Sequence, residues 1–313
     1  MNRKKIKMNK IKFLIAKCFL IVAVFLLQSE VSYAQQLPLL NQNREGVNPA
    51  NLSANYFNYN TPTTINLRYR YQWTRLDDAP QTLIGSFTHF AEDYNFIYGA
   101  NIIKDQTGPT GFTGIYGRAG YLLELSDDLA LSIGVQGGIV NYTVKGDELN
   151  FLEEGDVANT EINNIHPDFS LGTMLYYKEN YYIGFSVPQV LGLNLEFKDD
   201  VNDYNVERVR HYYGIIGGRF EIDDESYIEL SSEARYVEDV PFYINGRIEY
   251  EHKRMFFISA GGSSSREINL GLGVIGDIGA GNVLRVGYTF SNFFQSFGPN
   301  FGTVHEIYAS FSL

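Results

Sequence analysis

The chain has little of several residues, and each shortage excludes a class of structure. It has one cysteine in 313 residues, Cys18, and that residue lies in an apolar stretch near the N-terminus. If this stretch is removed as a leader, no disulfide framework or thiol chemistry remains. After residue 27, no apolar run approaches the roughly 20 residues that a transmembrane helix needs. A membrane location for the rest of the chain would therefore require strands.

Positive charge is also scarce after the N-terminus. Residues 1–34 hold seven of the 25 basic residues and one of the 36 acidic residues. The remaining 279 residues thus carry 18 basic and 35 acidic side chains, a net charge near −17. An acidic surface repels a phosphate backbone, so nucleic acid is disfavoured as a partner.

The N-terminus has the pattern of a secretory signal peptide. A basic region over residues 3–12 precedes an apolar core from Phe13 to Leu27, and Ser32-Tyr33-Ala34 provides small residues for cleavage before Gln35. This core of 15 residues, which includes Lys17, is short for a helix that crosses a membrane. The alternative, a retained anchor, is disfavoured by the cleavage site. Cys18 lies in the middle of the apolar core, which disfavours a lipoprotein.

The last residues alternate with a period of two, which is typical of a strand with one apolar face. The apolar set is Ile307, Ala309, Phe311 and Leu313, and the polar set is Glu306, Tyr308, Ser310 and Ser312. A soluble domain rarely ends on an unprotected strand, because its open edge invites aggregation. A barrel that pairs its last strand with its first explains this ending.

The same period recurs along the chain and predicts an all-β fold, an outer-membrane antiparallel β-barrel of about 14 strands. In the first strand, Ile65, Leu67 and Tyr69 alternate with Arg68 and Arg70. Aromatic residues make up 15% of the chain, which suits aromatic girdles on long strands. A soluble β-sandwich is the alternative. It would account for the alternation but not for the leader. The predicted strands are 65–74, 80–91, 95–104, 112–126, 128–143, 167–178, 181–190, 207–222, 226–237, 241–251, 254–262, 267–276, 282–291 and 304–313.

Connection lengths give an independent indication of orientation. Even-numbered connections are short, whereas odd ones include the long segments 145–166, 191–206 and 292–303. Short periplasmic turns and longer outer loops are typical of outer-membrane barrels. An even number of strands then places both ends of the barrel at the periplasmic rim.

Three regions follow from these patterns. Residues 1–34 form the predicted signal peptide, 35–62 a periplasmic arm or a plug in the lumen, and 63–313 the transmembrane barrel. The middle region is rich in asparagine and has no sustained period. We favour the plug, since a long free arm would be sensitive to proteases.

Apparent chemical motifs have structural explanations in this context. Gly271, Gly273 and Gly276 fit GxGxxG, but they lie within a predicted strand, where glycine is expected for wall curvature rather than pyrophosphate binding. Acidic loop residues that could bind calcium do not match an EF-hand loop, and the five histidines lack paired ligand spacing. We therefore predict no catalytic, cofactor or metal site and no enzyme activity. The calcium candidates are Asp147, Glu148, Glu153, Glu154, Asp156, Asp199, Asp200 and Asp203; the histidines are His89, His166, His211, His252 and His305.

Charged residues on the predicted inner faces are the candidate functional residues. They could line a solute path, or they could pair with one another across a polar lumen, as is common in barrels. The lumen-lining candidates are Arg68, Arg70, Arg118, Glu124, Glu229, Glu233, Arg235, Arg247, Glu249, Arg285 and Glu306.

Seven short segments follow one another in order along the chain after the leader. They are Asn48-Pro49-Ala50, Tyr69-Arg70-Tyr71-Gln72-Trp73, Ala79-Pro80-Gln81-Thr82, His166-Pro167-Asp168-Phe169, Tyr181-Tyr182-Ile183-Gly184-Phe185-Ser186-Val187-Pro188, Arg285-Val286-Gly287-Tyr288 and Gly302-Thr303-Val304-His305-Glu306-Ile307. Each segment is weakly specific alone, but their order and spacing cover nearly all of the chain after the leader. Together they resemble the PorP/SprF family of type IX secretion system membrane proteins. The last segment carries one residue more than the family's usual Gly-Ser-His-Glu-Ile.

The resemblance implies an outer-membrane barrel that works with type IX secretion. Such a barrel would contact outer-membrane lipid and would either support a secreted adhesin or act as a core component beside the periplasmic ring. In the first case it would pair with the adhesin's C-terminal domain and serve export, surface attachment and gliding motility. We favour the adhesin partner because of the long acidic outer loops. The alternative from another class is a passive, FadL-like transporter barrel.

Overall fold

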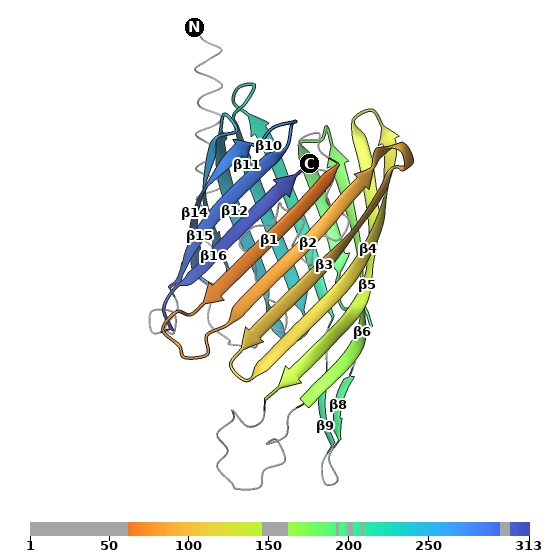
Figure 1. Ribbon diagram of the computed structural model, residues 1–313, viewed down its shortest axis with the longest axis vertical. Coiled ribbons are helices and arrows are strands. Elements are labelled where there is room, and N and C mark those ends of the chain that lie inside the picture. Colours follow the sequence, from red (N-terminus) through yellow and green to blue (C-terminus); the bar gives the residue numbers. More distant parts are fainter. Residues whose placement is uncertain (1–61, 146–161, 192–193, 199–202, 208–209, 295–300) are drawn as a thin grey trace.

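The computed structural model describes residues 62–145, 162–191, 194–198, 203–207, 210–294 and 301–313. Fourteen antiparallel strands close into a single barrel (Figure 1), as the alternation predicts. Each strand pairs with its sequence neighbours, except that β7 pairs directly with β10. The barrel strands are β1 (Thr63–Gln72), β2 (Gln81–Ala91), β3 (Phe96–Thr107), β4 (Thr110–Ser126), β5 (Leu129–Val144), β6 (Ile162–Tyr177), β7 (Tyr181–Val187), β10 (His211–Glu221), β11 (Tyr227–Val237), β12 (Val240–His252), β13 (Phe256–Ser263), β14 (Glu267–Asp277), β15 (Val283–Phe293) and β16 (Val304–Ser312).

The first and last strands close the barrel. In their register Ile65 lies opposite Phe311 and Arg70 opposite Glu306. Thr63 and Leu313 exchange two backbone hydrogen bonds, with N···O distances of 3.1 and 2.8 Å. We name the rim that holds these two residues the terminal rim, and the opposite rim, where β1 ends and β16 begins, the loop rim.

Deleting residues 311–313 is expected to reduce barrel assembly strongly. The deletion removes the pairing of Phe311 with both Ile65 and Leu284, together with the hydrogen bonds at Leu313. The unpaired backbone groups would face a membrane that offers them no hydrogen-bonding partner. Heat-dependent migration on a denaturing gel and recovery in the membrane fraction measure assembly. Phe311→Leu is the control that keeps the strand, and normal assembly of the deleted chain would contradict the prediction.

The terminal rim has short turns. A 3-10 turn, η1 (Glu92–Tyr94), joins β2 to β3 and is followed by Asn95 in the left-handed region, with φ of 50°. Between β10 and β11, the Asp223 carboxylate accepts a hydrogen bond from the backbone N–H of Glu225 at 3.0 Å. That hydrogen bond lowers the pKa of Asp223, because it favours the ionised form. Local hydrogen bonds thus stabilise tight connections at this rim.

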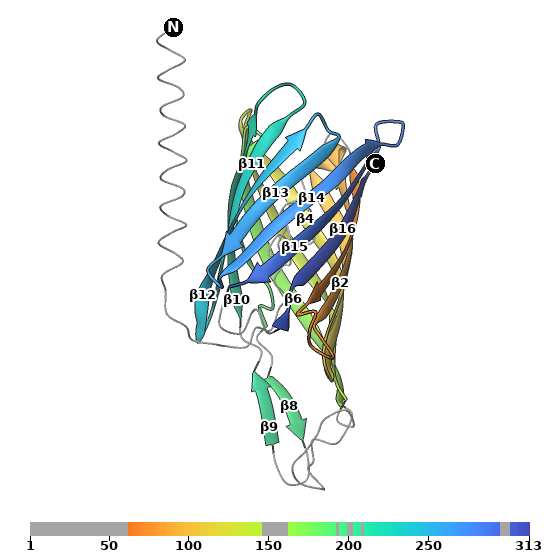
Figure 2. The same ribbon diagram turned by 90° about the vertical axis from the view of Figure 1, so that its left-hand side faces the viewer.

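The connection from β7 to β10 contains a hairpin that was not predicted. We expected a loop over 191–206 and a strand from residue 207; instead β8 (Asn194–Lys198) pairs with β9 (Asp203–Glu207), and β10 begins at His211. The sequence alternates in both short strands, but over five residues each this signal is weak. Among the described residues the hairpin pairs with no other strand, and it projects beyond the loop rim (Figure 2).

The start of β6 was also predicted wrongly. We expected residue 167 as the first residue of this strand. A proline inside a strand has no N–H to donate to the sheet, which makes an interior position unusual. The structure begins β6 at Ile162 and places Pro167 inside the strand, opposite Ile139 of β5. β5 and β6 are 16 residues each, so this part of the wall extends further at the loop rim.

The wall presents apolar side chains outward and mostly polar ones inward. In β1, Ile65, Leu67 and Tyr69 are exposed, whereas Arg68 and Arg70 are only 2% and 1% exposed. The outward alternation predicted for this strand is therefore present. Within the described ranges, the structure has no helix with the length and hydropathy needed to cross a membrane.

Candidate functional site

The inside of the barrel is divided into an apolar half and a charged half. Two clusters of buried apolar side chains lie on the half built by β2 to β7 and β10. Aromatic and aliphatic side chains at these inward positions depart from the polar interior that is common in membrane barrels. The first cluster, towards the loop rim, is Ile84, Ile103, Phe112, Tyr116, Val140 and Tyr213; the second, towards the terminal rim, is Leu122, Met174, Tyr176, Tyr182 and Ile215.

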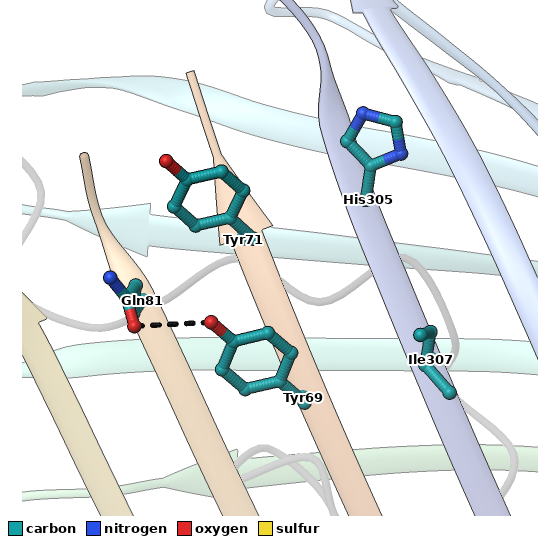
Figure 3. Close-up of a pocket in the computed structure, with 5 residues that line it drawn as sticks. All are labelled: Tyr69, Tyr71, Gln81, His305 and Ile307. Atoms are coloured by element: carbon teal, nitrogen blue, oxygen red, sulfur yellow. Dashed lines mark hydrogen bonds between the residues drawn. The ribbon is translucent and has the colours of Figure 1, made fainter. Parts of the chain in front are cut away.

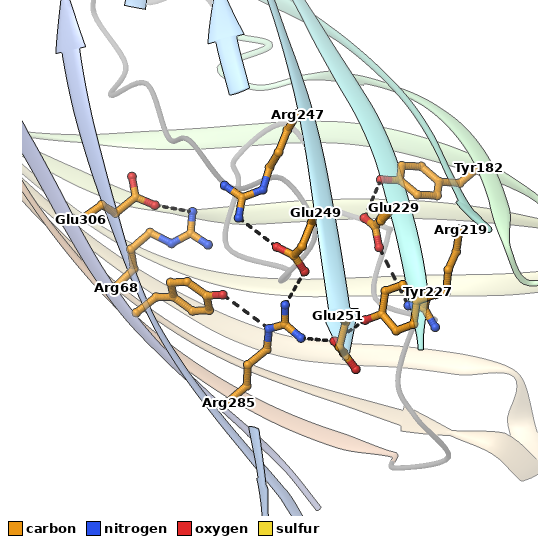
Figure 4. A network of polar contacts seen from close by, with 11 residues as sticks. Arg68, Tyr182, Arg219, Tyr227, Glu229, Arg247, Glu249, Glu251, Arg285 and Glu306 are labelled. Carbon is orange, nitrogen blue, oxygen red and sulfur yellow. Dashed lines mark hydrogen bonds and ion pairs between the residues drawn. The ribbon is translucent and has the colours of Figure 1, made fainter. Parts of the chain in front are cut away.

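The charged half is built by β1, β11, β12 and β14 to β16, and most of the lumen-lining candidates lie there. Their side chains point inward, and several converge in one polar network (Figure 4). Glu124 differs, because it is exposed near the terminal end of β4. The buried candidates, none more than 9% exposed, are Arg68, Arg70, Arg118, Glu229, Glu233, Arg235, Arg247, Glu249, Arg285 and Glu306.

Arg285 is the centre of this network. Its guanidinium forms ion pairs with Glu249 and Glu251 of β12, although β13 and β14 separate β12 from β15. Its Nε donates a hydrogen bond to the Tyr308 hydroxyl at 3.4 Å, and its Cζ lies 3.8 Å from the centre of the Phe257 ring. One side chain therefore ties β15 to β12, β13 and β16.

Two glycines of β14 leave room for side chains of the adjacent β13. A Cβ atom on Gly273 would lie 2.2 Å from the Phe257 ring and 2.3 Å from the backbone oxygen of Val286. A Cβ atom on Gly271 would lie 2.4 Å from the hydroxyl of Ser259. The glycines of the GxGxxG pattern thus lie inside a strand, as predicted, and two of them make room for side chains from the neighbouring strand.

A second charged group lies nearer the loop rim. The Glu306 carboxylate lies 3.4 Å from Arg68 and 3.2 Å from Arg70, and Arg70 also lies 3.8 Å from Glu267. Arg68 lies over the Tyr308 ring at 5.7 Å, so Tyr308 connects this group with Arg285. All of these carboxylates and guanidiniums are buried, which makes their pairing necessary rather than incidental.

Two charged candidates on β11, Glu229 and Arg235, contact tyrosines on other strands. Glu229 accepts a hydrogen bond from Tyr182 at 3.4 Å and lies 4.0 Å from Arg219 on the adjacent strand. Arg235 donates to the Tyr213 hydroxyl at 3.4 Å, and its Cζ lies 5.1 Å from the Tyr243 ring. Arginine and tyrosine therefore join the charged half to the apolar half.

Arg118 lies apart from the other candidates, on the apolar half. It crosses β3 towards the Phe87 backbone oxygen of β2 at 3.5 Å. Gly99 of β3 makes this path available, since a Cβ atom there would lie 2.7 Å from Arg118 Nε. Arg118 therefore lies along the wall over a glycine and reaches the second strand away.

Sequence reasoning missed several members of the network. Glu251 is fully buried and accepts a hydrogen bond from the Tyr227 hydroxyl, and Asp168 accepts one from Tyr116 at 2.9 Å. Glu251 has the same parity as Glu249 in β12, so alternation alone could have identified it. Asp168 lay within a segment of the family resemblance but was not considered as an inward charge.

The candidate cation sites lie largely outside what the structure describes. The acidic residues of 146–161, and Asp199 and Asp200, fall outside the described residues, and only the backbone pairing of Asp203 is described. Within the part of the chain that is described, no group of three or more His, Cys, Asp or Glu side chains could hold a metal ion.

Solved structures with a similar fold are outer-membrane barrels of low sequence identity. A Pseudomonas aeruginosa FadL homologue matches at 9% identity and a TM-score of 0.49, covering 88% of this chain and 99% of its own. The Pseudomonas putida toluene transporter TodX matches at 8% identity and 0.47, covering 85% and 96%. Acinetobacter baumannii Omp33 matches at 8% and 0.43, covering 81% and 98%.

Comparison with protein-family models is more specific than comparison with solved structures. No curated protein matches the chain. The model of the family described as type IX secretion system membrane protein PorP/SprF matches residues 31–311, which is most of the chain. The matched range includes every barrel strand apart from the last residue of β16. The chain is therefore a member of the PorP/SprF family of type IX secretion system membrane proteins.

Proposed function

We propose that this barrel supports export and surface attachment of a partner adhesin by type IX secretion, through contact with the adhesin's C-terminal domain. Gliding motility would follow where the adhesin is a motility adhesin. The observation that carries the proposal is the β8–β9 hairpin, which stands beyond the loop rim and pairs with no other described strand. A hairpin with open edges can accept an added strand from a partner. Family membership supplies the secretion system.

The acidic charge of two segments also favours the loop rim as the surface that contacts the adhesin. Segment 191–209 contains five acidic and two basic residues, and 145–161 contains six acidic and one basic residue. Both segments leave the barrel at the loop rim, between β5 and β6 and between β7 and β10. Acidic loops on one rim would attract a domain with a basic face and raise its association rate.

Replacing residues 192–209 by a short Gly-Ser linker is expected to reduce adhesin attachment strongly while the barrel still assembles. β7 and β10 pair directly, so the barrel does not need the hairpin to close. Loss of a central contact surface should reduce adhesin on the cell surface by about tenfold or more. Surface antibody labelling measures attachment, and heat-dependent gel migration reports the barrel.

The matched control replaces residues 278–281, a turn on the terminal rim, by the same linker. This variant should retain normal attachment. If the hairpin variant also attaches normally, or if native co-purification recovers periplasmic ring proteins and no adhesin, the adhesin role fails and the core role is favoured.

The remaining parts of the proposal concern the N-terminus and the interior. We propose cleavage between Ala34 and Gln35 and a lumen plug over residues 35–62, all but the last of which lie outside the described residues. We also propose that the charged half of the interior braces the wall. Its arginines and glutamates pair with one another, and a braced wall needs no solute path.

A second candidate function is passive passage of apolar solutes, and the apolar half of the interior favours it. Planar-bilayer conductance and uptake into vesicles separate the two functions. A stable open pore, or saturable uptake of an aromatic solute, would favour transport. Closed behaviour with normal adhesin attachment would favour the secretion role.

A further inference from the structure

A hollow of about 440 Å³ lies on the outer wall, where the barrel closes. It is lined by Tyr69, Tyr71, Gln81, His305 and Ile307, from β1, β2 and β16 (Figure 3). Tyr69 and Ile307 are 39% and 52% exposed, whereas the intervening inward side chains of Arg70 and Glu306 are buried. The hollow therefore belongs to the outward, apolar surface and is separate from the interior network.

The end of the hollow nearest the loop rim is polar. Tyr71 lies opposite His305 in the register of β1 and β16. The His305 ring is held on both sides, with Nδ1 2.6 Å from the Tyr288 hydroxyl and Nε2 2.9 Å from the Thr303 hydroxyl. Aromatic and polar side chains at this level could contact a headgroup, as interfacial tyrosines do in membrane proteins.

Beside these side chains, the Tyr69 hydroxyl donates a hydrogen bond to Gln81 Oε1 at 3.1 Å. This leaves the amide nitrogen of Gln81 at the rim of the hollow as a donor group. The polar end thus offers the Tyr71 hydroxyl and the Gln81 amide nitrogen as donors to the oxygens of a lipid headgroup, and the His305 ring, held by Tyr288 and Thr303, lies beside them.

The end of the hollow towards the middle of the wall is apolar. Ile307 and the Tyr69 ring lie there. One step further along β1, the outward Leu67 lies opposite Ala309 of β16 and Gly85 of β2. Leu67 is 55% exposed, so an acyl chain that starts at Ile307 can pack against it.

We propose that this hollow binds one membrane phospholipid, with its headgroup at Tyr71, Gln81 and His305 and an acyl chain along Leu67 and Ala309. The occupant is a lipid because the face is part of the exposed apolar wall and because its polarity changes from the rim to the middle as that of a phospholipid does. A lipid seated there would cover the seam between β1 and β16.

The single tryptophan of the chain gives a direct test. Trp73 follows Tyr71 after the end of β1, and its ring lies 5.6 Å from that of Phe301. Full-length barrel in detergent is titrated with phosphatidylethanolamine carrying a nitroxide on its headgroup, which quenches nearby tryptophan fluorescence. We expect saturable quenching at one lipid per barrel, and native mass spectrometry should detect one retained lipid.

Two variants and a matched control determine the result. Ala309→Phe places a large side chain where the acyl chain would lie, and Tyr71→Phe with Gln81→Leu removes polar groups from the headgroup end; each is expected to raise the half-saturation concentration by about tenfold. Val274→Phe enlarges an outward side chain on β14, away from the seam, and should change nothing. Heat-dependent gel migration verifies that each variant is folded.

Several outcomes would overturn the proposal. Quenching that never saturates, or that is equal in all variants, would mean bulk partitioning only. Dimers that Ala309→Phe dissociates, without saturable quenching, would assign the hollow to a second copy of the chain. Since this site lies on the lipid-facing wall, neither outcome bears on the adhesin role of the loop rim.

Discussion

Arg285→Met is expected to lower the free energy of unfolding of the barrel by about 3–5 kcal/mol, the usual cost of removing one partner from a buried ion pair. The substitution would leave the fully buried Glu251 without its ion pair, whereas Glu249 would keep its ion pair with Arg247 at 2.9 Å. It would also remove the contact of the guanidinium with the Phe257 ring. Methionine has similar length, so little of the effect would come from a cavity.

Urea titration of the barrel in lipid vesicles, followed by Trp73 fluorescence, measures this change. Adding Glu251→Gln to Arg285→Met should recover much of the loss, because the two partners of this buried ion pair are then removed together. Arg254→Met, at an exposed position in the turn after β12, should cost less than about 1 kcal/mol. If Arg285→Met unfolds at the wild-type urea concentration, Arg285 does not brace the wall.

Gly273→Val is expected to prevent assembly or to destabilise the barrel by at least about 3 kcal/mol, at the upper end of overpacking costs. The added Cβ would meet the Phe257 ring at 2.2 Å and the Val286 backbone oxygen at 2.3 Å. The ring could turn aside, but the oxygen belongs to the adjacent strand of the wall and cannot move without disturbing the β14–β15 pairing.

Gly276→Val is the matched control, since it lies in the same strand and the same GxGxxG pattern. A Cβ atom at Gly276 would meet nothing within 4 Å, so this variant should assemble normally. Equal behaviour of the two variants in heat-dependent gel migration would contradict the steric role of Gly273. Loss of assembly in both would indicate that β14 tolerates no side chain at these positions.

Alternation was enough to predict the barrel, because a closed wall repeats one simple rule along every strand. In β1 the rule placed Ile65 and Leu67 outward and Arg68 and Arg70 inward, and the structure has this arrangement. It failed where the signal is short, at β8 and β9, and at the start of β6, which lies five residues before Pro167.

The partners of the inward charges could not be predicted in the same way. Arg285 meets Glu249 and Glu251 across two intervening strands, so the contact depends on the curvature of the closed wall. This curvature is not visible in the spacing of the residues along the chain. The hollow at Tyr71 and His305 was missed because its lining comes from both ends of the barrel, which meet only after closure.

The seam between β1 and β16 has a consequence for folding kinetics. The Arg70–Glu306 contact joins residues 236 positions apart, so forming it requires closure of a very long loop. Folding slows as contacting residues become more distant in sequence. In the thirteen other strand pairs of the barrel, the paired strands are much closer together along the chain. Closing the seam is therefore expected to be the slow step of folding. Until it is complete, the two edges of the sheet stay open to aggregation or to capture by an assembly factor.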